Sequence, residues 1–122
     1  MFDSVEDAVA AIRRGEIVIV TDDESRENEG DFVMAADKAT EESVNFMTKH
    51  GRGLLCVTMT AERLSNLGLS RMATKGRGSP FSTAFMESVD AARNVTTGIS
   101  AHDRSEAIRV LADERSTPAD LV

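Results

Sequence analysis

The sequence predicts an α+β fold, a mixed sheet flanked by helices, in a single domain spanning residues 1–122. Two observations predict this class. Segments with apolar residues at helical spacing alternate along the chain with short apolar runs that are typical of strands. In addition, a chain of 122 residues is long enough to bury a core within one domain.

The first third of the chain predicts a helix followed by two strands. Ser4 and Asp7 form a capping pair ahead of apolar residues at helical spacing, and Gly15 ends this helix. The run EIVIVT (16–21) predicts a buried strand, and FVMAA (32–36) predicts a second strand that returns to the core. Residues 22–31 are therefore expected to connect two strands.

The remainder predicts three more helices with extended segments between them. Thr40 caps a helix that runs to about His50, Thr60 caps a short helix, and Ser100 opens a last helix together with Asp103. LLCVTM (54–59) predicts a third strand, and residues 82–91 are β-like with imperfect alternation. Residues 68–82, with KGRGSP at 75–80, predict a loop.

Composition excludes several classes of partner. The formal net charge of −7 argues against a nucleic-acid or anionic-membrane partner, because both require a basic surface. Cys56 is the single cysteine, so no internal disulfide is expected. No apolar run approaches the roughly 18 residues of a membrane span. The amino terminus is acidic where a signal peptide is basic, which favours the cytoplasm.

The stretch DDESRENEGD (22–31) places six carboxylates and the single cation Arg26 between the two predicted strands. A solvated turn is the ordinary explanation of an acidic run. A calcium hand is excluded, because Glu27 stands at the sixth position, where that motif requires glycine. A hard divalent ion held by one or two carboxylates, with water and substrate oxygens, fits the pattern better, and Mg²⁺ is the expected ion.

Three motifs in the same order carry a resemblance to a known family: DDESRENEGD, HGRGLLCV (50–57) and NVTTGISAHDR (94–104). Together they resemble the amino-terminal part of 3,4-dihydroxy-2-butanone 4-phosphate synthase, and the similarity spans roughly residues 4–121. The resemblance implies that family's fold and a homodimer. It also implies a magnesium-dependent lyase, with Mn²⁺ as the alternative metal, that converts ribulose 5-phosphate to dihydroxybutanone phosphate and formate.

The acid cluster receives specific roles from this resemblance. Arg26 and Glu27 resemble the family's substrate-contacting pair, and Glu27 also resembles a magnesium ligand. Asp31 resembles a second substrate-binding and catalytic carboxylate, and Glu29 stands where the family keeps an acid suited to proton transfer. Carboxylates not bound to metal are expected to have pKa values raised by their neighbours. For Arg26, a structural ion pair remains the alternative.

Other candidates lie outside the cluster. The apolar residues beside Cys56 in the sequence predict that it is a small core residue. The resemblance instead implies an active-site cysteine in this strand. Thr97 is expected to contact the phosphate of the neighbouring subunit's substrate. The backbone amides of the TTGIS loop, at a helix amino terminus, are expected to bind the same phosphate. A plain turn with a helix cap is the alternative. KGRGSP is a weak phosphate candidate and is expected to be a loop that closes over the site. His50 and His102 are expected to be structural.

Members of the resembled family continue beyond the point that corresponds to Val122, into histidine-containing segments with a second metal ligand. This departure leaves a second interpretation open. The chain is then a catalytically impaired relative that binds magnesium, a sugar phosphate, or a partner chain that completes the site.

Overall fold

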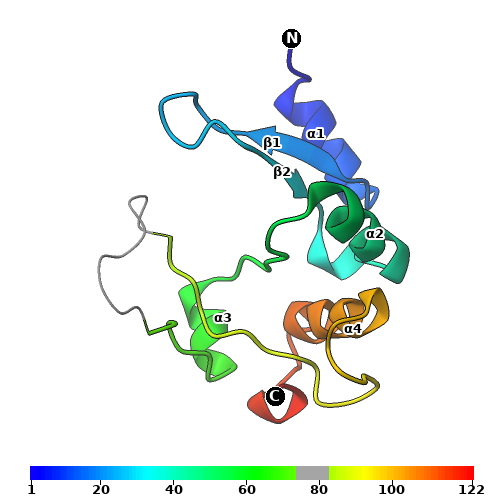
Figure 1. Ribbon diagram of the computed structural model, residues 1–122, viewed down its shortest axis with the longest axis vertical. Coiled ribbons are helices and arrows are strands. Elements are labelled where there is room, and N and C mark those ends of the chain that lie inside the picture. The colour runs from blue at the N-terminus through cyan, green and yellow to red at the C-terminus, as the bar shows by residue number, and fades with distance from the viewer. Residues whose placement is uncertain (74–82) are drawn as a thin grey trace.

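The computed structural model describes residues 1–73 and 83–122, and it confirms the α+β class with helices and a two-stranded sheet (Figure 1). The sheet is smaller than expected, because within these residues it comprises two antiparallel strands rather than a mixed sheet. The KGRGSP segment (75–80) lies outside the described residues. No helix in the two described ranges is long and apolar enough to cross a bilayer.

The strands form a hairpin around the acidic stretch, as expected. β1 (Val18–Thr21) pairs with β2 (Gly30–Val33), with Val20 opposite Asp31. The expected burial of the first strand is wrong, because Ile19 is 67% exposed and Val20 is 50% exposed. A strand is buried only when other elements cover its faces, and α1 makes a limited contact with β1.

All four predicted helix starts are confirmed, because each depends on a local hydrogen bond from a backbone N–H to a side-chain oxygen. The longer helices end as expected: the α1 helix is followed by Gly15 at φ +80°, and α2 continues into a π-helical turn, η2 (Met47–Gly51). The helices and their caps are α1 (Val5–Arg13, Ser4), α2 (Glu41–Phe46, Thr40), α3 (Ala61–Asn66, Thr60) and α4 (Ala101–Ala112, Ser100).

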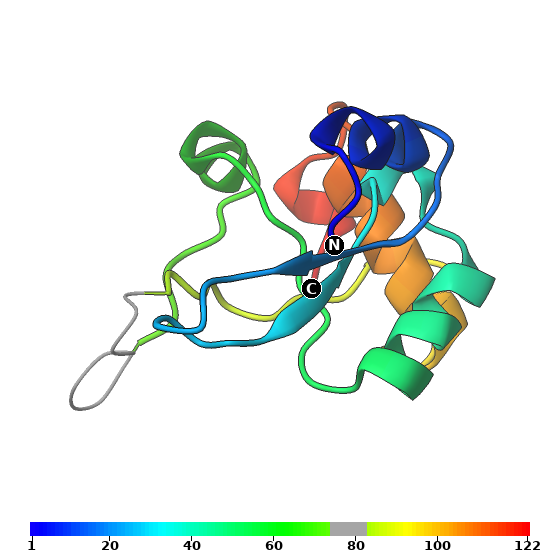
Figure 2. The same ribbon diagram turned by 90° about the horizontal axis from the view of Figure 1, so that it is seen from above.

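The core lies where α2 packs against α4, as both views show (Figures 1 and 2). Val44 on α2 is fully buried, and Ala107 and Ile108 on α4 are 8% and 7% exposed. The rings of Phe32 and Phe46 lie 5.5 Å apart and join β2 to α2. This aromatic contact helps to anchor the hairpin to the helical layer.

The predicted third strand, LLCVTM, is not paired in the described part of the chain. Exposure still alternates along it, with Leu54 78% exposed and Leu55 half-buried, so the period of two is present without a partner strand. Residues 83–91 likewise form isolated bridges, Met86 to Arg71 and Ala91 to Leu121, rather than a strand. Strand formation requires a neighbouring edge, which local patterning does not specify.

Candidate functional site

Asp22 organises the acidic hairpin loop from within. Its Oδ2 accepts a hydrogen bond from the Glu27 amide at 2.9 Å, and its Oδ1 accepts one from the Glu29 amide at 2.9 Å. The Asp22 amide in turn donates to the Glu29 carbonyl at 3.3 Å. One side chain thus fixes the path of the chain from residue 22 to residue 29.

The pKa of Asp22 lies below its usual value, chiefly because the Glu29 and Glu27 amides donate to the ionised form. The pKa of Asp23 is also lowered, first by the Ser25 hydroxyl at 2.6 Å and then by the Ser25 amide at 2.8 Å. The expectation that neighbouring acids raise these pKa values is therefore wrong for Asp22 and Asp23. For Asp23, the Ser25 donors outweigh repulsion from the neighbouring Asp22 carboxylate.

Arg26 lies between two carboxylates of the same loop. Its Nη1 donates to Asp22 Oδ2 at 2.9 Å, and its Nη2 lies 2.9 Å from Glu27 Oε1. Its side chain is 52% exposed. The structural ion pair that sequence analysis left as an alternative is therefore present, and it holds the Glu27 carboxylate in place at the loop.

The hairpin brings together four of the predicted site residues, Arg26, Glu27, Glu29 and Asp31. Asp31 lies on β2, and Glu29 immediately precedes that strand; both are exposed. Residues two apart on a strand project from the same face, so Glu29 and Asp31 belong to one side of the hairpin. Several carboxylates are thus presented to solvent at one end of the molecule.

Within residues 1–73 and 83–122, no group of three or more His, Cys, Asp or Glu side chains is arranged to hold a metal ion. The donors at the hairpin are nevertheless the hard oxygens that Mg²⁺ prefers, and Mg²⁺ in proteins commonly has one or two carboxylate ligands with water and substrate completing the octahedron. Glu27, held by Arg26 and the Asp22-ordered backbone, fits a site with few protein ligands.

Cys56 is exposed, so its interpretation as a small core residue is wrong. It lies on the unpaired segment between η2 and α3, where alternate residues face solvent. Its apolar neighbours in sequence suggested burial, but burial of this face requires a partner that the described chain does not supply. The thiol is accessible to reagents and to ligands.

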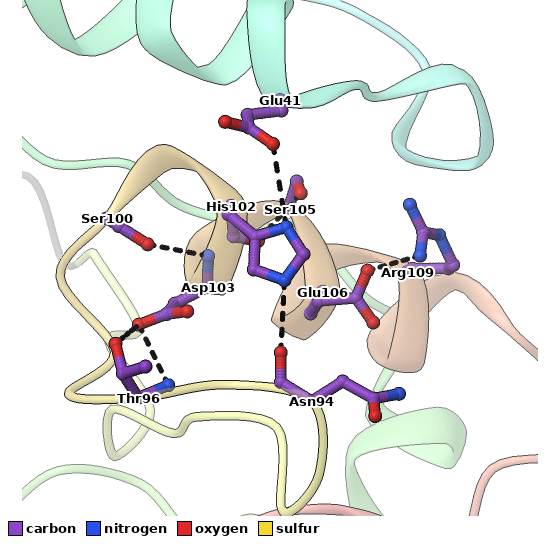
Figure 3. Close-up of polar contacts among 9 residues, drawn as sticks. All are labelled: Glu41, Asn94, Thr96, Ser100, His102, Asp103, Ser105, Glu106 and Arg109. Atoms are coloured by element: carbon purple, nitrogen blue, oxygen red, sulfur yellow. Dashed lines mark hydrogen bonds and ion pairs between the residues drawn. The ribbon is translucent and has the colours of Figure 1, made fainter.

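The loop containing Thr97 is ordered by Asp103 of α4, whose side chain is 2% exposed (Figure 3). Asp103 Oδ2 accepts from the Thr96 hydroxyl at 2.8 Å, the Thr96 amide at 3.2 Å and the Gly98 amide at 3.0 Å. The expectation that these amides receive a phosphate is therefore wrong for Thr96 and Gly98. An internal carboxylate already occupies that position, and Thr97 itself is exposed between them.

The loop that precedes α4 is not close to the tip of the acidic hairpin in the folded chain. Figures 1 and 2 place the segment directly before α4 and the tip of the β1–β2 hairpin at opposite ends of the molecule. A single copy of this chain therefore does not bring that loop to the tip of the hairpin.

Both histidines make internal contacts, in keeping with structural roles. His102 Nε2 lies 3.0 Å from the Asn94 carbonyl oxygen, and its Nδ1 lies 3.5 Å from Glu41 Oε2 on α2 (Figure 3). Both partners are hydrogen-bond acceptors, so the doubly protonated ring can donate to each of them. The pKa of His102 is therefore raised, chiefly by the hydrogen bond to the Asn94 carbonyl. The His50 ring packs 4.7 Å from Phe46.

Sequence analysis did not assign loop-organising roles to Asp22 and Asp103. A signal existed for Asp22, because an aspartate directly after a strand commonly accepts from amides further along the chain. Asp103 stands at the capping-box position, and its amide does donate to Ser100 Oγ at 3.0 Å. Its side chain, however, turns to the preceding loop, which the capping pattern does not indicate.

Comparison with known proteins places these features in a family. The family model described as 3,4-dihydroxy-2-butanone 4-phosphate synthase matches residues 6–122. Proteins of that name from Pseudomonas aeruginosa and Agrobacterium fabrum are 47% and 50% identical over 119 and 117 residues, respectively 98% and 96% of this chain. The chain spans 32% of the first relative's length and 54% of the second's.

A solved 3,4-dihydroxy-2-butanone 4-phosphate synthase in complex with two magnesium ions superposes with a TM-score of 0.94 at 44% identity. The match covers 99% of this chain and 56% of that one. A cation-free form of such a synthase matches with a TM-score of 0.90 at 42% identity, covering all of this chain and 55% of the other. The chain therefore belongs to the 3,4-dihydroxy-2-butanone 4-phosphate synthase family.

Proposed function

We propose that this chain forms the acidic-hairpin half of a magnesium-dependent lyase that converts ribulose 5-phosphate to 3,4-dihydroxy-2-butanone 4-phosphate and formate. The observation that supports this most directly is the hairpin itself, in which the half-buried Asp22 carboxylate accepts from the backbone amides of Glu27 and Glu29 while the Glu29 and Asp31 side chains are exposed. Family membership and the hard-oxygen donors at the hairpin support the same reaction.

Four residues of the hairpin have defined tasks in this proposal. Glu27 binds the metal and substrate oxygens, and Arg26 orients Glu27 and donates to the substrate. Glu29 and Asp31 accept and return protons at the sugar carbons, since exposed carboxylates can exchange protons with a bound substrate. A bound Mg²⁺ polarises the sugar's carbonyl and hydroxyl oxygens and offsets the repulsion among the acids. Cys56 is proposed to line the same site.

We further propose that the active site is formed by residues from more than one polypeptide chain. The loop before α4, which contains Thr97, and the tip of the hairpin lie at opposite ends of one copy (Figures 1 and 2), so Thr97 is proposed to contact the phosphate of a substrate held by a second copy, in a homodimer, or by a partner chain. Sedimentation at several protein concentrations tests this arrangement. We propose the cytoplasm as its location, with Mn²⁺ as an alternative metal.

A binding module without turnover is the second candidate function. The observation that favours it is that Arg26, Asp22 and Glu27 bind one another within the loop, so structural contacts account for these side chains without a reaction. In this case the chain binds magnesium and sugar phosphate without turnover.

The experiment that tests the proposal measures formate release from ribulose 5-phosphate with Mg²⁺ and, in parallel, binding of ribulose 5-phosphate by calorimetry with and without the metal. Glu27→Ala is expected to abolish both signals. Glu24→Ala, an exposed acid of the same loop without a proposed role, is the matched control and is expected to leave them unchanged. Metal-dependent binding without formate supports the binding module. Absence of binding refutes both candidates.

A further inference from the structure

Three consecutive residues in the first turn of α4 hold the loop that precedes the helix, and Figure 3 shows the first two, His102 and Asp103. The His102 imidazole contacts the Asn94 carbonyl oxygen. The Asp103 carboxylate accepts three hydrogen bonds from Thr96 and Gly98. The Arg104 guanidinium donates to the Ile99 carbonyl at 3.0 Å. The loop is thus shaped by the helix.

Asp103 contributes most to this arrangement. It is 2% exposed, and its Oδ2 accepts hydrogen bonds from two backbone amides and one hydroxyl. Burial alone would raise its pKa, but the bonds from Thr96 and Gly98 together lower it, so the carboxylate is ionised. It also lies in the first turn of a 12-residue helix, where the helix dipole favours a negative charge.

The consequence for Thr97 is geometric. Its two neighbours, Thr96 and Gly98, are both tied to the same carboxylate oxygen, so the backbone on each side of Thr97 is fixed. Gly98 adopts φ +82°, which turns the chain sharply after Thr97. Thr97 is exposed at the resulting corner, whereas the amides of Thr96 and Gly98 donate to Asp103.

We propose that Asp103 is a positioning residue for Thr97, and that it presents the Thr97 hydroxyl and amide to the phosphate of a sugar-phosphate substrate. This inference rests on the proposed function, in which Thr97 contacts that phosphate. Asp103 does not touch the substrate. It acts by fixing the loop, because it accepts hydrogen bonds from the donors of Thr96 and Gly98. Without it, the loop loses its fixed corner, and phosphate binding then requires ordering of several residues.

A double-mutant cycle tests the proposal. The dissociation constant of ribulose 5-phosphate is measured for the wild type, Thr97→Val, Asp103→Asn and the double variant. Asn removes the negative charge and leaves a neutral carbonyl oxygen, which is a weaker acceptor for the same three donors. Each single variant is expected to weaken binding about tenfold, and the double variant is expected to bind no more weakly than Thr97→Val, because both act through one contact.

Two controls separate this role from a general loss of structure. Asp113→Asn makes the same chemical change at the other end of α4, where the carboxylate accepts from Arg115, and is expected to leave binding unchanged. Binding of ribulose, which lacks the phosphate, is expected to be equal in the wild type and Asp103→Asn. Additive losses in the cycle, or equal losses for both sugars, would overturn the proposal in favour of a purely structural role.

The outcomes also distinguish this inference from the proposed function. If the wild type does not bind ribulose 5-phosphate, the proposed function fails. If the wild type binds it and Asp103→Asn binds equally well, the positioning role alone fails. Should Asp103→Asn not fold, Thr96→Val removes a single hydroxyl donor to Asp103 and is expected to weaken binding about threefold with the same dependence on Thr97.

Discussion

Substitution of Gly98 by alanine should destabilise the fold through two separate costs. Gly98 adopts φ +82°, a left-handed conformation that costs a residue with a Cβ about 1–2 kcal/mol. The added Cβ would also lie 2.3 Å from Asp90 Oδ2 and 2.5 Å from both Cγ and Oδ1, so the Asp90 side chain must move. Overpacking of this kind costs about 1–3 kcal/mol, and we predict a total loss of about 2–5 kcal/mol.

Gly53→Ala is the matched control, because Gly53 has φ +60° but its added Cβ would meet no described atom within 4 Å. It should lose only the backbone term, about 1–2 kcal/mol. The assay is urea unfolding followed by circular dichroism, with the free energy of unfolding extrapolated to water. In an Asp90→Ala background, Gly98→Ala should cost no more than Gly53→Ala. Equal losses for Gly98→Ala and Gly53→Ala in the wild-type background would refute the close packing of Asp90 on Gly98.

Three further predictions concern the core, a histidine and the cysteine. Val44→Ala, which empties part of the α2–α4 interface, should lower the free energy of unfolding by about 2 kcal/mol, whereas Val9→Ala at a 43% exposed position of α1 should change it by less than about 0.5 kcal/mol in urea unfolding. Because folding raises the pKa of His102, the protonated ring stabilises the folded state. This contribution is complete below the pKa of the unfolded state, about 6.5, and is lost as the pH rises through the pKa of the folded state. The urea midpoint of unfolding should thus fall as the pH rises above about 6.5, and His102→Gln should remove that component. An unchanged pH profile would contradict the two-acceptor contact. Native Cys56 should react with a thiol reagent nearly as fast as in urea, and protection would contradict its exposure.

The helices were predictable because their starts are local. Ser4, Thr40, Thr60 and Ser100 each accept from an amide three residues ahead, and such contacts are fixed by sequence spacing alone. The hairpin was predictable for a related reason, since two apolar runs flank a polar stretch. The same reasoning located four of the predicted site residues on one loop.

Burial and strand pairing were not predictable in this way. Cys56 and Ile19 have apolar sequence neighbours and yet are exposed, because their burial depends on elements that must pack over them. The unpaired segment 54–59 has the alternation of a strand without the neighbouring edge that a strand requires. For Asp103, the capping pattern correctly predicted the amide contact, but the side chain had a stronger competing set of donors in the loop.

The short sequence span of the contacts at α4 has a consequence for folding order. The bonds from residues 102–104 to the preceding loop connect positions only 5 to 8 apart, whereas Arg63 reaches the Asp113 carbonyl, at 2.6 Å, across 50 positions. Closing a short loop costs little chain entropy and takes about 10–100 ns, while long-range contacts form later. We therefore expect the segment from Asn94 through the first turn of α4 to reach its native shape early and to serve as a preformed unit onto which α2 packs.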